Sequence, residues 1–192
     1  MGRPDHSERR RDELIPTIAA TFAEFGYRRT TTAVLAERCS AQETILYRLW
    51  PDKRAMFTAS IDYVVEHSEA IWTKATSRSN AVTTAEAVLD YEADHLGELG
   101  LYRILFAGLS ETDDPAIAKA LRAAYRSFHR FLLARTVEHR EQRSARSLPD
   151  AELAAWALLG LGTVVNLGRE LGLLPKKARS RLLSTVGRHL LG

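Results

Sequence analysis

Apolar residues recur at intervals of three and four along most of the chain, which is the spacing of amphipathic α-helices. Alternating runs of Val, Ile and Thr, which would indicate strands, are missing from the sequence. The pattern therefore predicts an all-α protein with about nine helices. We expect these helices at residues 7–25, 32–39, 42–49, 53–74, 84–99, 101–109, 115–143, 150–171 and 176–190.

Three local features affect where these helices begin and end. Pro16 cannot donate a hydrogen bond to the carbonyl of Asp12, so the first helix is expected either to kink or to begin near Asp12. Ser40 and Glu43 have the spacing of a capping box, which would start the third helix two residues early. The polar stretch 76–84 is predicted to be a loop.

The segment 31–50 is the most informative part of the sequence. It is predicted to form two short helices joined by a tight turn, with an inward apolar stripe of Ile45, Leu46 and Leu49 on the second helix. This is the arrangement of a helix-turn-helix unit, whose second helix enters the major groove of DNA. Other short helical hairpins share the spacing, so the pattern alone leaves nucleic-acid binding open.

Residues beyond the unit carry a resemblance to a family. From Leu14 to Met56 the chain resembles the TetR family of bacterial transcriptional repressors. The matching residues are Phe22, Gly26, Tyr27, Thr30, Thr31, Leu35, Ala36, Leu46, Tyr47, Trp50, Pro51 and Lys53. The sequence departs from the family at the turn, where Ser40 replaces the usual Gly, and at Gln42, Thr44 and Ile45. The resemblance implies a DNA-binding domain at 1–52 and a ligand-binding and dimerisation domain at 53–192.

Side-chain chemistry together with the resemblance predicts the residues that contact DNA. Gln42 and Arg48 can donate to base edges or phosphates, Glu43 can accept from cytosine, and Ile45 can touch a thymine methyl. The resemblance implies that Tyr47 and Lys53 contact phosphates; a core position for Tyr47 and a capping role for Glu43 are the alternatives. The full predicted set is Thr31, Thr32, Ser40, Ala41, Gln42, Glu43, Thr44, Ile45, Tyr47, Arg48, Trp50 and Lys53.

Charge and composition add modest support for a polyanionic partner. The net charge is +3 and the pI is about 9.2, with ten Lys/Arg and eight Asp/Glu in residues 1–54. The triplet Arg9-Arg10-Arg11 either faces phosphates or forms a solvated helix face. The single cysteine, the lack of a signal peptide and an uncharged run at 153–168 that is shorter than the ~20 residues of a membrane span predict a cytoplasmic protein.

The expected helix at 150–171 is apolar on all sides, which indicates burial on two sides. With the last helix it is predicted to form half of a four-helix homodimer interface, the alternative being a core helix of a monomer. The predicted interface residues are Trp156, Leu159, Gly160, Thr163, Leu167, Leu182, Val186 and Leu190. A homodimer would present two recognition helices to an inverted repeat.

Glu92 falls on the apolar stripe formed by Ala85, Val88, Leu89, Leu96 and Leu99. A carboxylate at an apolar position must be paired, protonated or in contact with a polar cavity. We therefore predict a cavity for a small-molecule effector; the alternatives are an ordinary aromatic core and an ion pair of Glu92 with Arg126 or Arg130. The predicted lining residues are Trp72, Tyr91, Glu92, His95, Tyr102, Phe106, Phe128 and Trp156.

Two other classes of protein are weighed against a ligand-responsive DNA-binding repressor. A ferritin-like metalloenzyme needs two Glu-x-x-His pairs, and Glu92 and His95 form the one such spacing in the sequence. A helical adaptor that binds another protein and no DNA is the second alternative. No phosphate-binding loop, nucleophile elbow or Cys/His cluster is present in the sequence, so no enzyme activity, metal or cofactor is expected.

Overall fold

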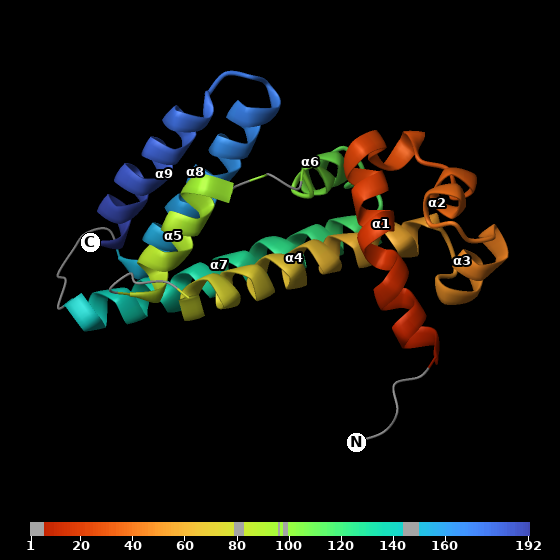
Figure 1. Cartoon of the computed structure of the whole chain (residues 1–192), viewed down its shortest axis with the longest axis horizontal. Helices are drawn as coiled ribbons and strands as arrows, with labels where there is room; N and C mark the ends of the chain where they lie inside the picture. The colour runs from red at the N-terminus through yellow and green to blue at the C-terminus, as the bar shows by residue number, and fades with distance from the viewer. Residues whose placement is uncertain (1–5, 79–82, 96, 98–99, 144–149) are drawn as a thin grey trace. The chain divides into compact units, whose positions relative to one another are not determined.

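The computed structural model describes residues 6–78, 83–95, 97, 100–143 and 150–192, and these residues form nine α-helices and no strand. The all-α prediction is thus confirmed (Figure 1). The helices are α1 (His6–Arg29), α2 (Thr32–Arg38), α3 (Glu43–Leu49), α4 (Lys53–Arg78), α5 (Thr84–His95), α6 (Arg103–Leu109), α7 (Pro115–Arg143), α8 (Ala151–Glu170) and α9 (Lys176–Leu191).

The chain divides into two compact units. Unit 1 comprises residues 1–66 and 99–124, and unit 2 comprises residues 67–98 and 125–192. The division falls inside α4 and α7, so each of these helices contributes to both units. The predicted boundary at residue 52 separates DNA binding from ligand binding and dimerisation. It divides the chain by function and not by contacts, and it stays a prediction.

Unit 1 is built around the apolar stripe of α1. Leu14, Ile18 and Phe22 are buried on this stripe, and Phe22 meets Phe57 of α4 edge to face with ring centroids 5.0 Å apart. Leu35 of α2 and the Leu46–Leu49 pair of α3 complete the same core. The apolar faces of α1, α2 and α3 are thereby fixed against one another, as the sequence pattern predicted.

Several helix boundaries differ from the predicted ones, most of them by one or two residues. The first helix begins at His6 and runs through Pro16, so the expected start near Asp12 is wrong. Its non-helical residue is Gly26, with φ +77°, which separates a last short turn from the rest of α1. Helix α4 continues to Arg78, beyond the predicted end at Lys74, while residues 79–82 of the predicted loop lie outside the described residues.

In unit 2, α9 packs against both α5 and α8. A β-carbon at Gly187 would lie 2.8 Å from Cδ2 of Leu89, so this glycine allows α9 to approach α5 closely. At the end of α9, Arg140 donates to the carbonyls of Leu190 and Leu191 at 3.0 and 2.9 Å. These bonds satisfy carbonyl groups that a helix terminus leaves unpaired. Of the predicted α5 stripe, Leu96 and Leu99 lie outside the described residues.

Helix α8 has 20 residues and is, by length and composition alone, apolar enough to cross a membrane. Only 33% of its most apolar window is buried in the structure. The helix therefore exposes apolar surface that calls for a covering partner.

Candidate nucleic-acid interface

The turn between α2 and α3 depends on a backbone conformation that is rare for a residue with a side chain. Ser40 has φ +49°, and its amide donates to the carbonyl of Glu37 at 3.0 Å. The amide of Ala41 donates to the carbonyl of Ala36 at 2.9 Å. Together these are the two hydrogen bonds of a Schellman motif, which normally has glycine in the left-handed position. Ser40 therefore adopts the left-handed conformation that glycine normally takes in this motif.

This turn rules out the predicted capping box. Helix α3 begins at Glu43, its N-cap is Gln42, and no side chain accepts a hydrogen bond at the cap. Because Ser40 belongs to the closing turn of α2, its left-handed backbone cannot also serve as the extended N-cap of α3. The next helix cannot begin until the chain has left that turn.

Helix α3 exposes one continuous polar face. Its inner face is formed by Leu46 and Leu49, which are buried, and Ile45 is half-buried. The exposed residues are Gln42, Glu43, Thr44, Tyr47 and Arg48. Thr31 and Ser40 are also exposed, so seven of the twelve predicted contact residues are exposed. Four others are half-buried: Thr32, Ala41, Ile45 and Lys53.

Trp50 is the predicted contact residue that the structure removes from the interface. Its side chain is 6% exposed, and its amide donates to the carbonyl of Leu46 at 2.8 Å to close α3. The indole is part of the core of unit 1 and offers no surface to a ligand. Its position after Leu49 continues the buried stripe of α3, which is a signal the sequence already contained.

Lys53 makes contacts within the chain, and its predicted phosphate contact stays a prediction. Its Nζ donates to the carbonyls of Tyr27 and Thr30, both at 3.1 Å, and lies 4.3 Å from the centroid of the Tyr27 ring. These carbonyls belong to the end of α1 and the residue that follows it. The ammonium group therefore joins the start of α4 to the chain between α1 and α2.

A second cation supports the end of α3. Nε of Arg11 donates to the carbonyl of Leu49 at 2.9 Å, so the third residue of the arginine triplet stabilises the terminus of this helix. Arg9 and Arg10 both pair with Glu13 on the solvated face of α1. The sequence predicted the charge cluster but not these partners, because a carbonyl partner has no signature in sequence.

The hydroxyl groups of Thr31 and Tyr47 both form hydrogen bonds with residues of α2, beside α3. Thr31 is the N-cap of α2 and accepts a hydrogen bond from the amide of Val34 at 3.2 Å. The phenol of Tyr47 donates to the hydroxyl of Thr32 at 3.1 Å, and the Tyr47 side chain is 47% exposed. The alternative of a core position for Tyr47 is thereby excluded.

Of the predicted ligand residues, Trp72 contacts Glu92 directly. The indole nitrogen of Trp72 donates to Oε1 of Glu92 at 2.5 Å, and the Trp72 ring lies 5.7 Å from Phe128. The other carboxyl oxygen, Oε2, is inaccessible to solvent and has no hydrogen-bond partner. Burial raises the pKa of this carboxyl to about 7, against the smaller opposing effects of the Trp72 hydrogen bond and of His95.

The proposed ion pair of Glu92 with Arg126 or Arg130 is wrong. Both arginines are exposed on α7, and the carboxyl group of Glu92 is bonded to Trp72.

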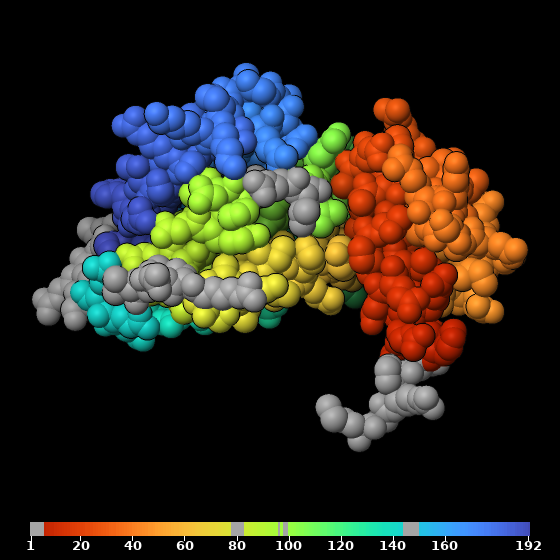
Figure 2. Space-filling model, viewed as in Figure 1, coloured from red at the N-terminus to blue at the C-terminus, as the bar shows by residue number. Residues whose placement is uncertain are grey.

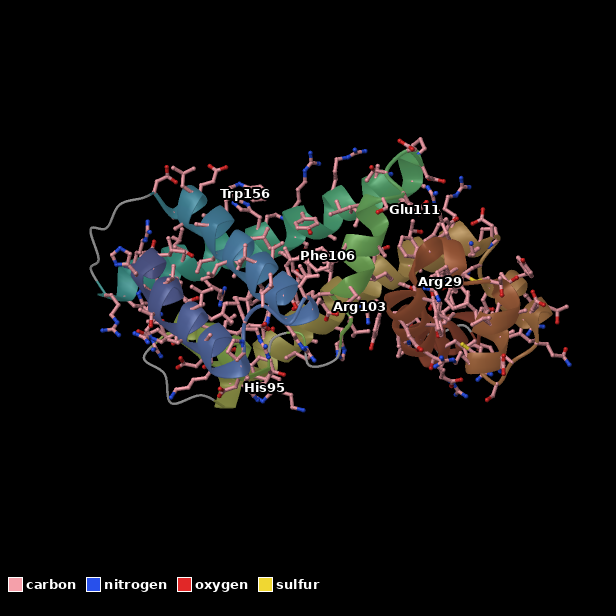
Figure 3. All side chains as sticks on the ribbon, turned by 90° about the horizontal axis from the view of Figure 1, so that it is seen from above. Arg29, His95, Arg103, Phe106, Glu111 and Trp156 are labelled. Carbon is pink, nitrogen blue, oxygen red and sulfur yellow. The ribbon has the colours of Figure 1, made fainter. Side chains whose placement is uncertain are left out.

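The remaining predicted ligand residues do not gather around Glu92. His95 is exposed and stacks on Tyr91, and Trp156 is 46% exposed and stacks on His129. Tyr102 and Phe106 belong to unit 1, so the predicted set does not fall within one unit. Figure 3 shows His95, Phe106 and Trp156 on α5, α6 and α8.

Helix α8 presents an apolar stripe to solvent. Leu153, Trp156, Gly160, Val164 and Leu167 follow one another at intervals of three and four, and all five are exposed. A β-carbon at Gly160 or Gly162 would meet nothing within 4 Å. Of the predicted interface residues, Val186 is also exposed, whereas Leu182 and Leu190 pack partly against the clusters inside unit 2. Leu159 and Thr163 are half-buried. Leu153 and Val164 belong to the stripe although they were not among the predicted interface residues.

Across the described ranges, no group of three or more His, Cys, Asp or Glu side chains is placed to hold a metal ion. His95 instead forms a hydrogen bond through Nδ1 with the carbonyl of Tyr91 at 2.9 Å. The spacing of Glu92 and His95 motivated the metalloenzyme alternative, but in the structure Glu92 bonds Trp72 and His95 bonds the carbonyl of Tyr91.

Comparisons with known proteins identify the N-terminal segment. Residues 14–59 match the family model described as bacterial regulatory proteins, tetR family. No curated protein matches the chain in sequence. Many solved structures share its fold, among them a transcriptional regulator of the TetR family from Cytophaga hutchinsonii, with a TM-score of 0.79 and 19% identity over 99% of this chain and 96% of that one.

Two further structures extend this likeness to proteins with named roles. The fatty acid degradation regulator FadR from Bacillus halodurans has a TM-score of 0.76 and 13% identity, covering 100% of this chain and 97% of that one. GusR from Salmonella enterica has a TM-score of 0.71 and 18% identity, covering 99% and 97%. At these identities the structures establish the fold, and the family resemblance of the sequence is confirmed.

Proposed function

We propose that this chain is a transcriptional regulator of the tetR family and represses transcription by binding an inverted-repeat operator as a homodimer. A small-molecule effector bound in unit 2 releases it from DNA. The protein works in the cytoplasm and carries out no reaction of its own.

The exposed face of α3 is the observation that supports DNA binding best. A buried stripe fixes the helix against α1 and α2, and the opposite face offers an amide, a carboxylate, a hydroxyl, a phenol and a guanidinium. These groups can read base edges in the major groove and bind phosphates. Arg48 is exposed at the end of this face, which suits a phosphate or guanine contact.

Homodimerisation is supported by the exposed stripe of α8. Apolar residues at helical spacing with no cover in the protomer match an isologous interface in which two copies bury the same surface. Two copies would place two α3 helices on one duplex, and the operator would then be a palindrome whose half-sites match the dimer.

Salt-dependent binding to the DNA upstream of its own gene tests the proposal. We expect the purified full chain to bind that fragment specifically, with an affinity that falls steeply as salt rises. Arg48→Ala should weaken binding by about 1–3 kcal/mol. Arg181→Ala, an exposed arginine of α9, is the matched control and should bind normally.

Wild-type protein that prefers neither this fragment nor any other promoter fragment over random DNA would instead support the helical adaptor. Footprinting of the same fragment checks the symmetry of the site: a protected palindrome is expected for a dimer.

A further inference from the structure

Unit 2 contains a small cavity bounded by α5, α8 and α9. Its volume is about 190 Å³, which is below the ~300–1,000 Å³ of sites for drug-sized molecules. The predicted ligand residues contribute only Glu92 to its lining. The cavity therefore has its own composition and is suited to a small metabolite.

The charges of the cavity are separated between its walls. Helix α5 contributes the carboxyl groups of Glu92 and Asp94. Helices α8 and α9 contribute three cations, Arg169, Lys176 and Arg179. Apolar side chains, Val165 and Leu183 among them, form the rest of the lining. A molecule that carries both signs of charge and a short apolar group would match all three parts.

One of the cations is held in place by the backbone, and a second occupies room that a glycine leaves. Nη1 of Arg179 donates to the carbonyl of Leu174 at 2.6 Å. Gly97 has φ +73°, and a β-carbon there would lie 2.7 Å from Nη1 of Arg169, so the glycine leaves the room that this guanidinium occupies. Positions fixed in this way reduce the conformational entropy that a ligand would have to remove.

Glu92 supplies independent support for a ligand. One of its oxygens is bonded to Trp72, and the other is buried without a hydrogen-bond partner. A buried acceptor without a partner is costly, and it is rare in native structures. Glu92 lines the cavity, so a cation or hydrogen-bond donor bound there would pair with this oxygen after the carboxyl group rotates toward it.

We propose that this cavity binds a small zwitterion, an α-amino acid with a short apolar side chain. Its ammonium group is held by Glu92 and Asp94, and its carboxylate by Arg169, Lys176 and Arg179. The apolar side chain lies against Val165 and Leu183. This inference rests on the proposed function, because it names the chemical class of the effector for a ligand-responsive regulator.

Isothermal titration calorimetry of the full chain tests the proposal with L-alanine, L-valine and L-leucine as separate probes. We expect at least one of them to bind. The amide of that amino acid, which lacks the carboxylate, and the corresponding acid without the amino group should each bind about tenfold more weakly or not at all. Failure of all three amino acids to bind would overturn the proposal, as would equal binding of the acid, which indicates a simple anion site.

Two neighbouring lysines provide a matched pair of variants. Lys176 lines the cavity, whereas Lys177 is exposed on the same turn of α9 and does not line it. Lys176→Gln should weaken amino acid binding about three- to fivefold, and Lys177→Gln should leave it unchanged. Equal effects of the two variants would contradict the assigned site. Both positions are exposed, so neither variant is expected to impair folding.

DNA binding distinguishes a failure of this inference from a failure of the proposed function. If the chain binds its upstream DNA but no amino acid, only the zwitterion site is wrong. If it binds an amino acid but no DNA, the cavity stands and the regulator function fails. If both are correct, the amino acid should change the affinity for DNA by about 5–150-fold, the usual range of allosteric coupling.

Discussion

Among single residues, Glu92 has the most measurable consequence. Its pKa of about 7 lies above the ordinary 4.5, so between these pH values the folded protein binds a proton that the unfolded chain has lost. The stabilisation from the neutral carboxyl is complete below pH 4.5 and is lost as pH rises through 7. Glu92→Gln keeps a neutral group, so it should raise the free energy of unfolding by about 1–3 kcal/mol at pH 8 and leave it unchanged near pH 4. Urea unfolding at both pH values measures the difference.

Glu86 is the control for this prediction because its shift has the opposite sign. Burial raises its pKa, but the hydrogen bond and charge of Arg143 outweigh burial and hold the pKa below its usual value. Glu86→Gln should therefore lower stability at pH 8. Two variants that both raise stability at pH 8 would show that the charge of Glu92 is not the cause.

Ser40 leads to a second prediction at the same scale. A residue with a β-carbon in the left-handed region costs about 1 kcal/mol relative to glycine, and Ser40 has φ +49°. Ser40→Gly should therefore raise the free energy of unfolding by about 1 kcal/mol, measured by urea unfolding. Ser110, the C-cap of α6, has φ −75°, so Ser110→Gly should bring no such gain. A gain of the same size at both positions would assign the effect to something other than the turn.

At the scale of helices and their ends, Lys53 can act in two ways, by stabilising the fold or by binding a phosphate. Loss of DNA binding in a variant would not distinguish these two roles, so stability and salt dependence are both measured. Since its ammonium group bonds two backbone carbonyls, Lys53→Ala should lower the free energy of unfolding by about 1–3 kcal/mol. Each lysine or arginine that binds a phosphate contributes about one unit to the salt dependence of DNA affinity. Lys53→Ala should leave that slope unchanged, and Arg48→Ala should reduce it by about one unit.

Titration of DNA binding against salt, with unfolding curves on the same variants, measures both quantities. A reduced salt slope together with unchanged stability in Lys53→Ala would support the phosphate contact that the family resemblance implies.

Helix positions were predictable from the sequence where a local signal fixes the end. Helix α7 begins at Pro115 as predicted, because the side chain of Asp114 accepts from the amides of Ala116 and Ile117 at 2.8 and 3.3 Å. The start of α3 was not predictable from Ser40 and Glu43, because a turn with the same residues can close the preceding helix instead. Side chains that bond distant carbonyls, such as Arg11, depend on tertiary contacts that periodicity does not encode.

The candidate sites were predictable to a similar degree. The polar face of α3 follows from helical periodicity and the resemblance together, and only Trp50 was placed on the wrong side. Glu92 was recognisable as an exception in an apolar stripe. Its partner and the basic wall of the cavity could not be predicted, because they depend on how α5, α8 and α9 pack.

At the scale of the whole molecule, the α8 stripe decides between two environments that could cover it, a second copy of the chain or a lipid bilayer. Helix α8 passes the length and composition test for a membrane span, but it is partly buried by α9 and its exposed apolar residues follow one stripe. The other apolar residues of α8 are buried or half-buried inside unit 2, where the helix packs against α9, so only this stripe needs a cover, and an isologous interface buries one face in this way. These observations favour the second copy.

Val164 belongs to this stripe and is 54% exposed, so replacing it should not disturb the core of unit 2. Val164→Glu would place two like charges without partners in a symmetric interface, and the dimer dissociation constant should rise at least about 100-fold. Light scattering with size-exclusion chromatography measures this change. Leu109→Glu, at a 52% exposed leucine of α6 that does not belong to the stripe, should stay dimeric.

The Val164→Glu monomer should also bind DNA differently, because each copy of the chain supplies one α3. It should lose affinity for an operator with two half-sites and keep weak binding to a single half-site. A wild-type chain that is monomeric in light scattering, or that partitions into lipid vesicles, would show that something other than a second copy covers α8.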